Sequence, residues 1–109
     1  MSDDAIVVFM TAANGEEASR LAEMLVGAHL AACVQILPEI ESVYRWQGKI
    51  ERSSEVLLLV KTTRDKFDGL ETQVRALHSY DTPEIVAVPI VAGSAPYLEW
   101  LVKSAGSNG

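Results

Sequence analysis

The sequence predicts a single α+β domain with the order strand, helix, strand, strand, helix, strand, followed by a short final helix. The first observation is a long period-2 hairpin pattern over residues 32–61. The second observation is a segment with apolar residues at helical spacing both before and after this hairpin in the sequence. The third is a short apolar run typical of a strand, found once before the first helical segment and once after the second. The 109-residue length suits one domain, with a core of about 5–103 and a frayed tail over 104–109.

The first predicted strand is a continuous apolar run, AIVVFM, over residues 5–10. Such a run is typical of a central strand that is buried on both faces. Asn14, followed three residues later by Glu17, is a capping-box pattern and predicts that a helix begins near Gly15. We expect this helix to reach about Leu30, because apolar residues recur at three- and four-residue spacing. They are Ala18, Leu21, Ala22, Leu25 and Ala28, with His29 as a further candidate.

The first strand of the hairpin, residues 32–46, has one side that is mostly apolar along its whole length. Its fifteen residues would span roughly 50 Å, whereas a domain of this size has a radius of gyration of about 13 Å. The hairpin should therefore extend beyond its own core, unless Pro38, which has no amide donor, creates an edge, a bulge or a bend. The apolar side consists of Ala32, Val34, Ile36, Pro38, Ile40, Ser42, Tyr44 and Trp46.

The return strand follows a tight turn at residues 47–49. It begins polar over 51–55 and becomes wholly apolar over 56–60, which predicts a solvent-exposed distal part and a buried root. Thr62 or Thr63 is expected to cap the second helix.

The remaining elements follow from spacing and from proline positions. Pro83 lies after the second helix, residues 85–91 predict the fourth strand, and Pro89 places the later half of that strand at an edge or bulge. A short helix is expected over 94–103, with Pro96 in its first turn. The apolar side of the second helix consists of Phe67, Leu70, Val74 and Leu77.

This order of elements is the β-α-β-β-α-β pattern of the ferredoxin-like fold. Right-handed crossovers place both helices on one face of the sheet and leave the other face bare in a monomer. Because the strands are apolar enough to bury that face, the sequence predicts an oligomer, with the extended hairpin contacting a neighbouring copy.

Composition excludes several classes of partner. The net charge of −6 argues against nucleic acid or an anionic membrane as the main partner. No apolar run approaches the roughly 20 residues of a membrane helix, and the acidic start lacks the basic region of a signal peptide. Cys33 is the only cysteine, so no internal disulfide can form and a cytoplasmic location is expected.

Four segments stand out along the chain: residues 30–34 (LAACV), 42–50 (SVYRWQGKI), 77–85 (LHSYDTPEI) and 97–100 (YLEW). Together, and in this order, they resemble the CutA divalent-cation tolerance family. The resemblance implies a ferredoxin-like protomer in a tight homotrimer, related in architecture to PII signalling proteins. It also implies a role in tolerance of copper and other divalent metals, with copper(II) or another divalent cation bound directly.

Cys33 and His78 are the candidate metal ligands. A thiolate and an imidazole suit copper or zinc, although a good site needs three or four ligands and no CxxC or HxxxH spacing supplies them. The alternative for Cys33 is a buried small hydrophobic residue at the root of a strand. The alternative for His78 is a turn residue that satisfies the backbone at the end of a helix.

A second group of residues can line a cleft between subunits. Tyr44 and Trp46 near the hairpin tip, Lys61 and Glu84 are the candidates for holding a small ligand or a cation, as a PII-like module would. The alternative for both aromatic side chains is that they anchor an interface between subunits.

We expect no enzymatic activity and no organic cofactor. The sequence contains no GxSxG, P-loop or GxGxxG motif. A nucleophilic pair of Cys33 with His78 is the one catalytic alternative, and a cysteine inside a buried strand is poorly exposed for that chemistry.

Overall fold

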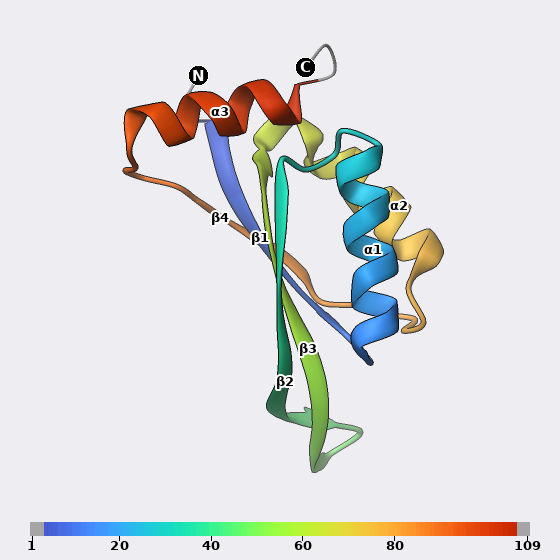
Figure 1. Cartoon of the computed structure of the whole chain (residues 1–109). Helices are drawn as coiled ribbons and strands as arrows, with labels where there is room; N and C mark the ends of the chain where they lie inside the picture. The colour runs from blue at the N-terminus through green and yellow to red at the C-terminus, as the bar shows by residue number, and fades with distance from the viewer. Residues whose placement is uncertain (1–3, 107–109) are drawn as a thin grey trace.

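The computed structural model describes residues 4–106 and confirms the predicted α+β fold (Figure 1). One antiparallel sheet has the strand order β2-β3-β1-β4. The elements are β1 (Ala5–Ala12), α1 (Gly15–Gly27), β2 (Cys33–Trp46), β3 (Lys49–Thr63), the 3₁₀ turn η2 (Arg64–Lys66), α2 (Phe67–Leu77), β4 (Ile85–Pro89) and α3 (Ala95–Ala105).

The main core lies between the sheet and the two helices α1 and α2, which cover the same face (Figure 1). Alternate residues of β1 and β3 point into it, as the period of a strand requires. A second, smaller cluster joins Ala5 to Leu98 and Leu101 of α3, which crosses the end of the sheet away from the hairpin tip. The largest side chains of the main core are Met10, Leu21, Leu25, Leu58 and Leu70.

Helix α1 ends at Gly27, three residues before the predicted end at Leu30. His29 has φ 60°, in the left-handed region, and is exposed. The amides of Leu30 and Ala31 both donate to the carbonyl of Leu25, which closes the helix in the manner of a left-handed C-terminal cap. The chain needs this reversal to enter β2, so His29 is not part of the apolar stripe of α1.

The hairpin turn is the two-residue Gln47-Gly48 loop, with φ of 52° and 79°. Positive φ at both positions is the requirement of a type I′ turn, whose twist matches that of the flanking strands. The predicted tight turn is therefore confirmed.

A β-bulge interrupts β2 at Pro38, as one of the predicted outcomes for this proline. Leu37 pairs with Leu57, but Ile40 pairs with Glu55, so two residues of β2 face one residue of β3. Glu39, inside the bulge, has φ 61°.

The bulge changes which side of the sheet each β2 residue occupies. Before it, Val34 pairs with Val60 on the helix-covered face; after it, Tyr44 pairs with Glu51, on the opposite face. The prediction of one continuous apolar side over residues 32–46 is therefore wrong, because the extra residue reverses the alternation.

Beyond the bulge, the hairpin forms an arm (residues 40–55) that extends past α1 and α2 (Figure 1). The longest dimension of the molecule is 44 Å and the radius of gyration is 14.4 Å. The predicted overhang is thus confirmed.

The face of the sheet opposite α1 and α2 carries apolar side chains that the protomer does not bury fully. We call it the open face. Val86 and Val88 of β4 are 54% and 45% exposed. In the strand register Phe9 is opposite both Leu59 and Val86, and Val7 is opposite Val88. The face consists of Val7, Phe9, Leu57, Leu59, Val86 and Val88.

The helices after the hairpin differ from expectation at their ends. Leu77, predicted on the apolar side of α2, is 46% exposed. Helix α3 continues to Ala105, two residues past the predicted Lys103, because Ala105 is fully buried. Residues 107–109 of the predicted tail lie outside the described residues. Within residues 4–106, no helix is long and apolar enough to cross a membrane.

Candidate functional site

His78 lies immediately after α2, and its side chain is fully buried. Its Nε2 lies 2.8 Å from the carbonyl oxygen of Thr11 at the end of β1, and the backbone N–H of Tyr80 donates to its Nδ1 at 3.0 Å. Because a carbonyl can only accept, Nε2 carries the hydrogen and Nδ1 offers its lone pair. Both nitrogens of His78 are therefore engaged within the protomer.

Glu17 joins the start of α1 to the segment after α2. The predicted N-cap is confirmed, since Glu17 N–H donates to Asn14 Oδ1 at 2.9 Å. The return bond of a capping box is shifted by one residue, because Glu17 Oε1 accepts at 2.9 Å from the N–H of Ala13, which precedes the cap. The same carboxylate accepts from the backbone N–H of Ser79 at 2.6 Å and from its hydroxyl at 3.1 Å. The His78 Nδ1 lies 3.6 Å from Glu17 Oε2.

This environment sets the charge of Glu17. Burial of the carboxylate favours its neutral form, but the hydrogen bonds from the backbone amides of Ala13 and Ser79 and from the Ser79 hydroxyl together lower the pKa of Glu17 below its ordinary value. The residue is 3% exposed and stays ionised near neutral pH.

Tyr80 connects the same segment to the root of the arm. Its hydroxyl donates to Glu55 Oε2 at 2.8 Å, and Ser42 donates to the other oxygen of Glu55 at 2.6 Å. The Tyr80 ring lies 4.7 Å from the imidazole of His78. Burial, and then the hydrogen bond to the Glu55 carboxylate, raise the pKa of Tyr80 well above its ordinary value.

The chemistry of this cluster is that of a closed hydrogen-bond network. No buried side-chain nitrogen or oxygen in the described part of the chain lacks a partner. The same residues, 4–106, contain no group of three or more His, Cys, Asp or Glu side chains placed to hold a metal ion. A cation at His78 would have to displace one of its two hydrogen bonds.

Cys33 and His78 do not lie together in one protomer. Cys33 is half-buried, has a free thiol and is the first residue of β2. It pairs with Lys61 of β3, and Lys61 pairs with Val7 of β1, so Cys33 lies at the level of Val7 in the sheet. His78 contacts Thr11, four residues farther along β1, a displacement of about 13 Å along the strand.

The candidate cleft residues are also separated. Lys61 lies near α3, where its Nζ donates to the Tyr97 hydroxyl at 3.2 Å. Trp46 pairs with Lys49 at the tip of the arm, twelve residues from Lys61 along β3, or about 40 Å. Tyr44 and Trp46 are 45% and 58% exposed, and Glu84 is exposed before β4. These four residues can share a cleft only between different copies of the chain.

Comparison with known proteins adds to this geometry. A family model described as "CutA1 divalent ion tolerance protein" matches residues 6–104. The chain belongs to the CutA1 family. It is 49% identical over 100 residues to the divalent-cation tolerance protein CutA of Thermus thermophilus, a match that covers 92% of this chain and 97% of that relative. The resemblance predicted from four segments is thus confirmed, and divalent-cation tolerance is the general role of the family.

The plant relatives are longer. The chain is 50% identical over 99 residues to the chloroplastic protein CutA of Arabidopsis thaliana, which covers 91% of this chain but 54% of that protein. It therefore spans about half the length of the plant CutA proteins that it matches.

Solved CutA1 structures have the same fold as this chain. A structure of the Thermus thermophilus protein superimposes with a TM-score of 0.92 at 48% identity, covering 94% of this chain and 99% of that one. The crystal structure of CutA1 from Oryza sativa gives 0.91 at 47% identity, covering 94% of each chain.

Sequence reasoning missed the long-range contacts of three residues that organise this CutA1 protomer: Glu17, Glu55 and Tyr80. The spacing of Asn14 and Glu17 gave the helix start, but the bonds from Glu17 to Ser79 join positions 62 residues apart. No local pattern reports such a contact.

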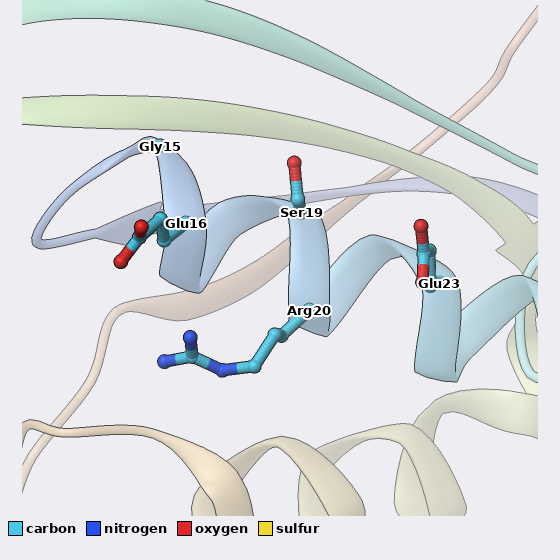
Figure 2. Close-up of a pocket in the computed structure, with 5 residues that line it drawn as sticks. All are labelled: Gly15, Glu16, Ser19, Arg20 and Glu23. Carbon is cyan, nitrogen blue, oxygen red and sulfur yellow. The ribbon is translucent and has the colours of Figure 1, made fainter.

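The protomer also has a depression on the outside of α1 (Figure 2). Figure 2 shows Glu16 and Arg20 extending to one side of the helix, and Ser19 and Glu23 to the other. The lining residues are exposed and include none of the candidates from the sequence, so the depression offers no buried group to fix a ligand. They are Gly15, Glu16, Ser19, Arg20 and Glu23.

Proposed function

We propose that this CutA1-family chain acts as a homotrimer that binds divalent metal ions directly, copper(II) first, and so contributes to metal tolerance and response. We further propose that it does so in the cytoplasm and without catalysis. A single unpaired cysteine suits a reducing compartment.

The observation that supports this proposal is that the candidate ligand and cleft residues lie far apart within one protomer. Cys33 lies beside Lys61 at one end of the sheet, whereas Trp46 lies at the tip of the arm and His78 is buried against Thr11. A copper or zinc site needs three or four ligands, and a protomer with an apolar open face and a long arm needs neighbours. Both requirements support a site that is completed between copies.

The test is calorimetric titration of copper(II) into the wild-type protein and into Cys33→Ser and His78→Ala. We expect one copper ion or fewer per protomer and loss of binding in either variant. His29→Ala is the matched control, because His29 is exposed outside the candidate set. Circular dichroism checks that His78→Ala is folded.

Two outcomes would contradict the proposal. Unchanged copper affinity in both Cys33→Ser and His78→Ala would remove these residues from the site. Absence of copper binding by the wild-type protein would exclude direct binding. The alternative prediction, a PII-like module for small molecules, gains no specific support from the described contacts, and we do not propose it.

A further inference from the structure

Within the protomer, packing does not fix the direction of the arm. It begins at a bulge, where Glu39 has φ 61°, and bulges bend and twist the strand that carries them. Most of residues 43–52 are exposed, with neither α1 nor α2 beside them (Figure 1). A two-stranded hairpin alone is marginally stable in water, so this element needs another restraint.

One contact supplies a restraint. Among the side-chain hydrogen bonds of residues 4–106, the bond from Tyr80 to Glu55 is the one that joins the arm to the rest of the protomer. The others made by arm residues, Ser42 to Glu55, Arg52 to Glu41 and Ser53 to Tyr44, stay within the arm. Glu55 is the last residue of the arm before the sheet, so this bond acts beside the bulge at which the arm begins.

Tyr80 is a suitable anchor because its own backbone is held. Its N–H donates to the buried imidazole of His78, and the preceding residue, Ser79, is bound through its N–H and hydroxyl to Glu17. The Tyr80–Glu55 bond therefore connects the arm to α1 and β1 through three consecutive residues. The Glu55 carboxylate makes this a charge-assisted bond, which is stronger than a neutral one.

We propose that the Tyr80–Glu55 hydrogen bond is a clasp that sets the direction of the arm relative to the sheet. Breaking it loosens the arm and, as a consequence, weakens association between copies of this chain. The effect on association rests on the proposed trimer, whereas the effect on the arm concerns the protomer itself.

The test compares Tyr80→Phe with Tyr44→Phe by hydrogen exchange of backbone amides. Both variants remove one phenolic oxygen, but that of Tyr44 accepts only from Ser53 within the arm. In Tyr80→Phe we expect the amides of residues 40–55 to exchange about tenfold faster or more, while those of β1 keep their wild-type rates. Tyr44→Phe should leave the arm near wild-type rates.

Glu55→Gln provides a second variant. It keeps an oxygen that can accept from the Tyr80 hydroxyl and removes only the charge, so it should speed exchange in the arm less than Tyr80→Phe does. The double variant should exchange no faster than Tyr80→Phe alone, because that change already removes the bond. Wild-type exchange in the arm of Tyr80→Phe, or equal acceleration in Tyr44→Phe, would overturn the clasp.

Sedimentation of the same proteins separates this inference from the proposed function. Two results together would support the clasp: copies of Tyr80→Phe associate more weakly than wild-type copies, and the assembly that still forms binds copper with wild-type affinity. A wild-type protein that sediments as a monomer would contradict the trimer, and the exchange rates of the arm would still decide whether the clasp exists.

Discussion

Glu17 Oε2 accepts a 2.6 Å hydrogen bond from the backbone N–H of Ser79, 62 residues later in the chain. The first turn of α1 thus holds the segment that follows α2. Because the same carboxylate also accepts from the N–H of Ala13, just before α1, it links local and long-range structure.

This link makes stability depend on pH. The pKa of Glu17 is lowered in the folded protein, so its contribution is present above the ordinary value of 4.5 and is lost as pH falls through the lowered folded value. Glu17→Gln should cost about 1–3 kcal/mol at pH 7 and reduce the loss of stability on acidification. Urea unfolding at pH 7 and pH 4 measures both effects.

The exposed neighbour Glu16 provides the control for Glu17. Glu16→Gln should change stability by less than about 0.5 kcal/mol at either pH. Equal losses in the two variants would show that the hydrogen bonds of Glu17 do not contribute as described.

His78 is a structural residue in the protomer whatever it binds in the assembly. His78→Ala removes a buried ring and leaves the Thr11 carbonyl and the Tyr80 amide without their partner. We expect a loss of roughly 2–4 kcal/mol in urea unfolding, against almost none for the exposed His29→Ala. A loss below about 1 kcal/mol for His78→Ala would contradict this account of its burial.

The hairpin turn depends on the freedom of glycine at position 48. Gly48 has φ 79°, so Gly48→Ala should destabilise the protein by about 1 kcal/mol although its Cβ would meet nothing within 4 Å. Gly15 at the start of α1 is equally uncrowded, but its φ is not in the left-handed region. Gly15→Ala should therefore be neutral or stabilising by up to about 1 kcal/mol. Thermal unfolding of both variants checks this contrast. Equal changes in Tm for Gly48→Ala and Gly15→Ala would contradict it.

The fold was predictable because its signals are local. The capping box at Asn14, the apolar runs and the helical stripes each report on one element, and their order restricts the topology. The bulge at Pro38 was expected only as one of three outcomes. Its consequence, the transfer of Tyr44 to the other face, depends on a single extra residue in the register.

The site was less predictable because it depends on contacts between distant elements. Sequence spacing cannot report that Cys33 and His78 lie at different levels of the sheet, or that Glu55 receives the hydroxyl of Tyr80. Polar residues in a turn, such as Ser79, look alike whether they bind water or a buried carboxylate.

We expect substitutions on the open face to weaken association between copies of the chain without unfolding the protomer. Val88→Glu places a charge on this face, and Val26→Glu places one on α1 at a residue of almost equal exposure, 44% against 45%. We expect Val88→Glu to weaken association and Val26→Glu to leave it unchanged, as measured by sedimentation equilibrium. Equal association of both variants would indicate that the face lies outside any interface.

The central claim is that the arm and the open face are covered by other copies of the chain. Sedimentation velocity of the wild-type protein at micromolar concentration tests it most directly. The account predicts one species with three times the chain mass of 11.8 kDa. A single 11.8 kDa species would contradict it, together with the shared metal site.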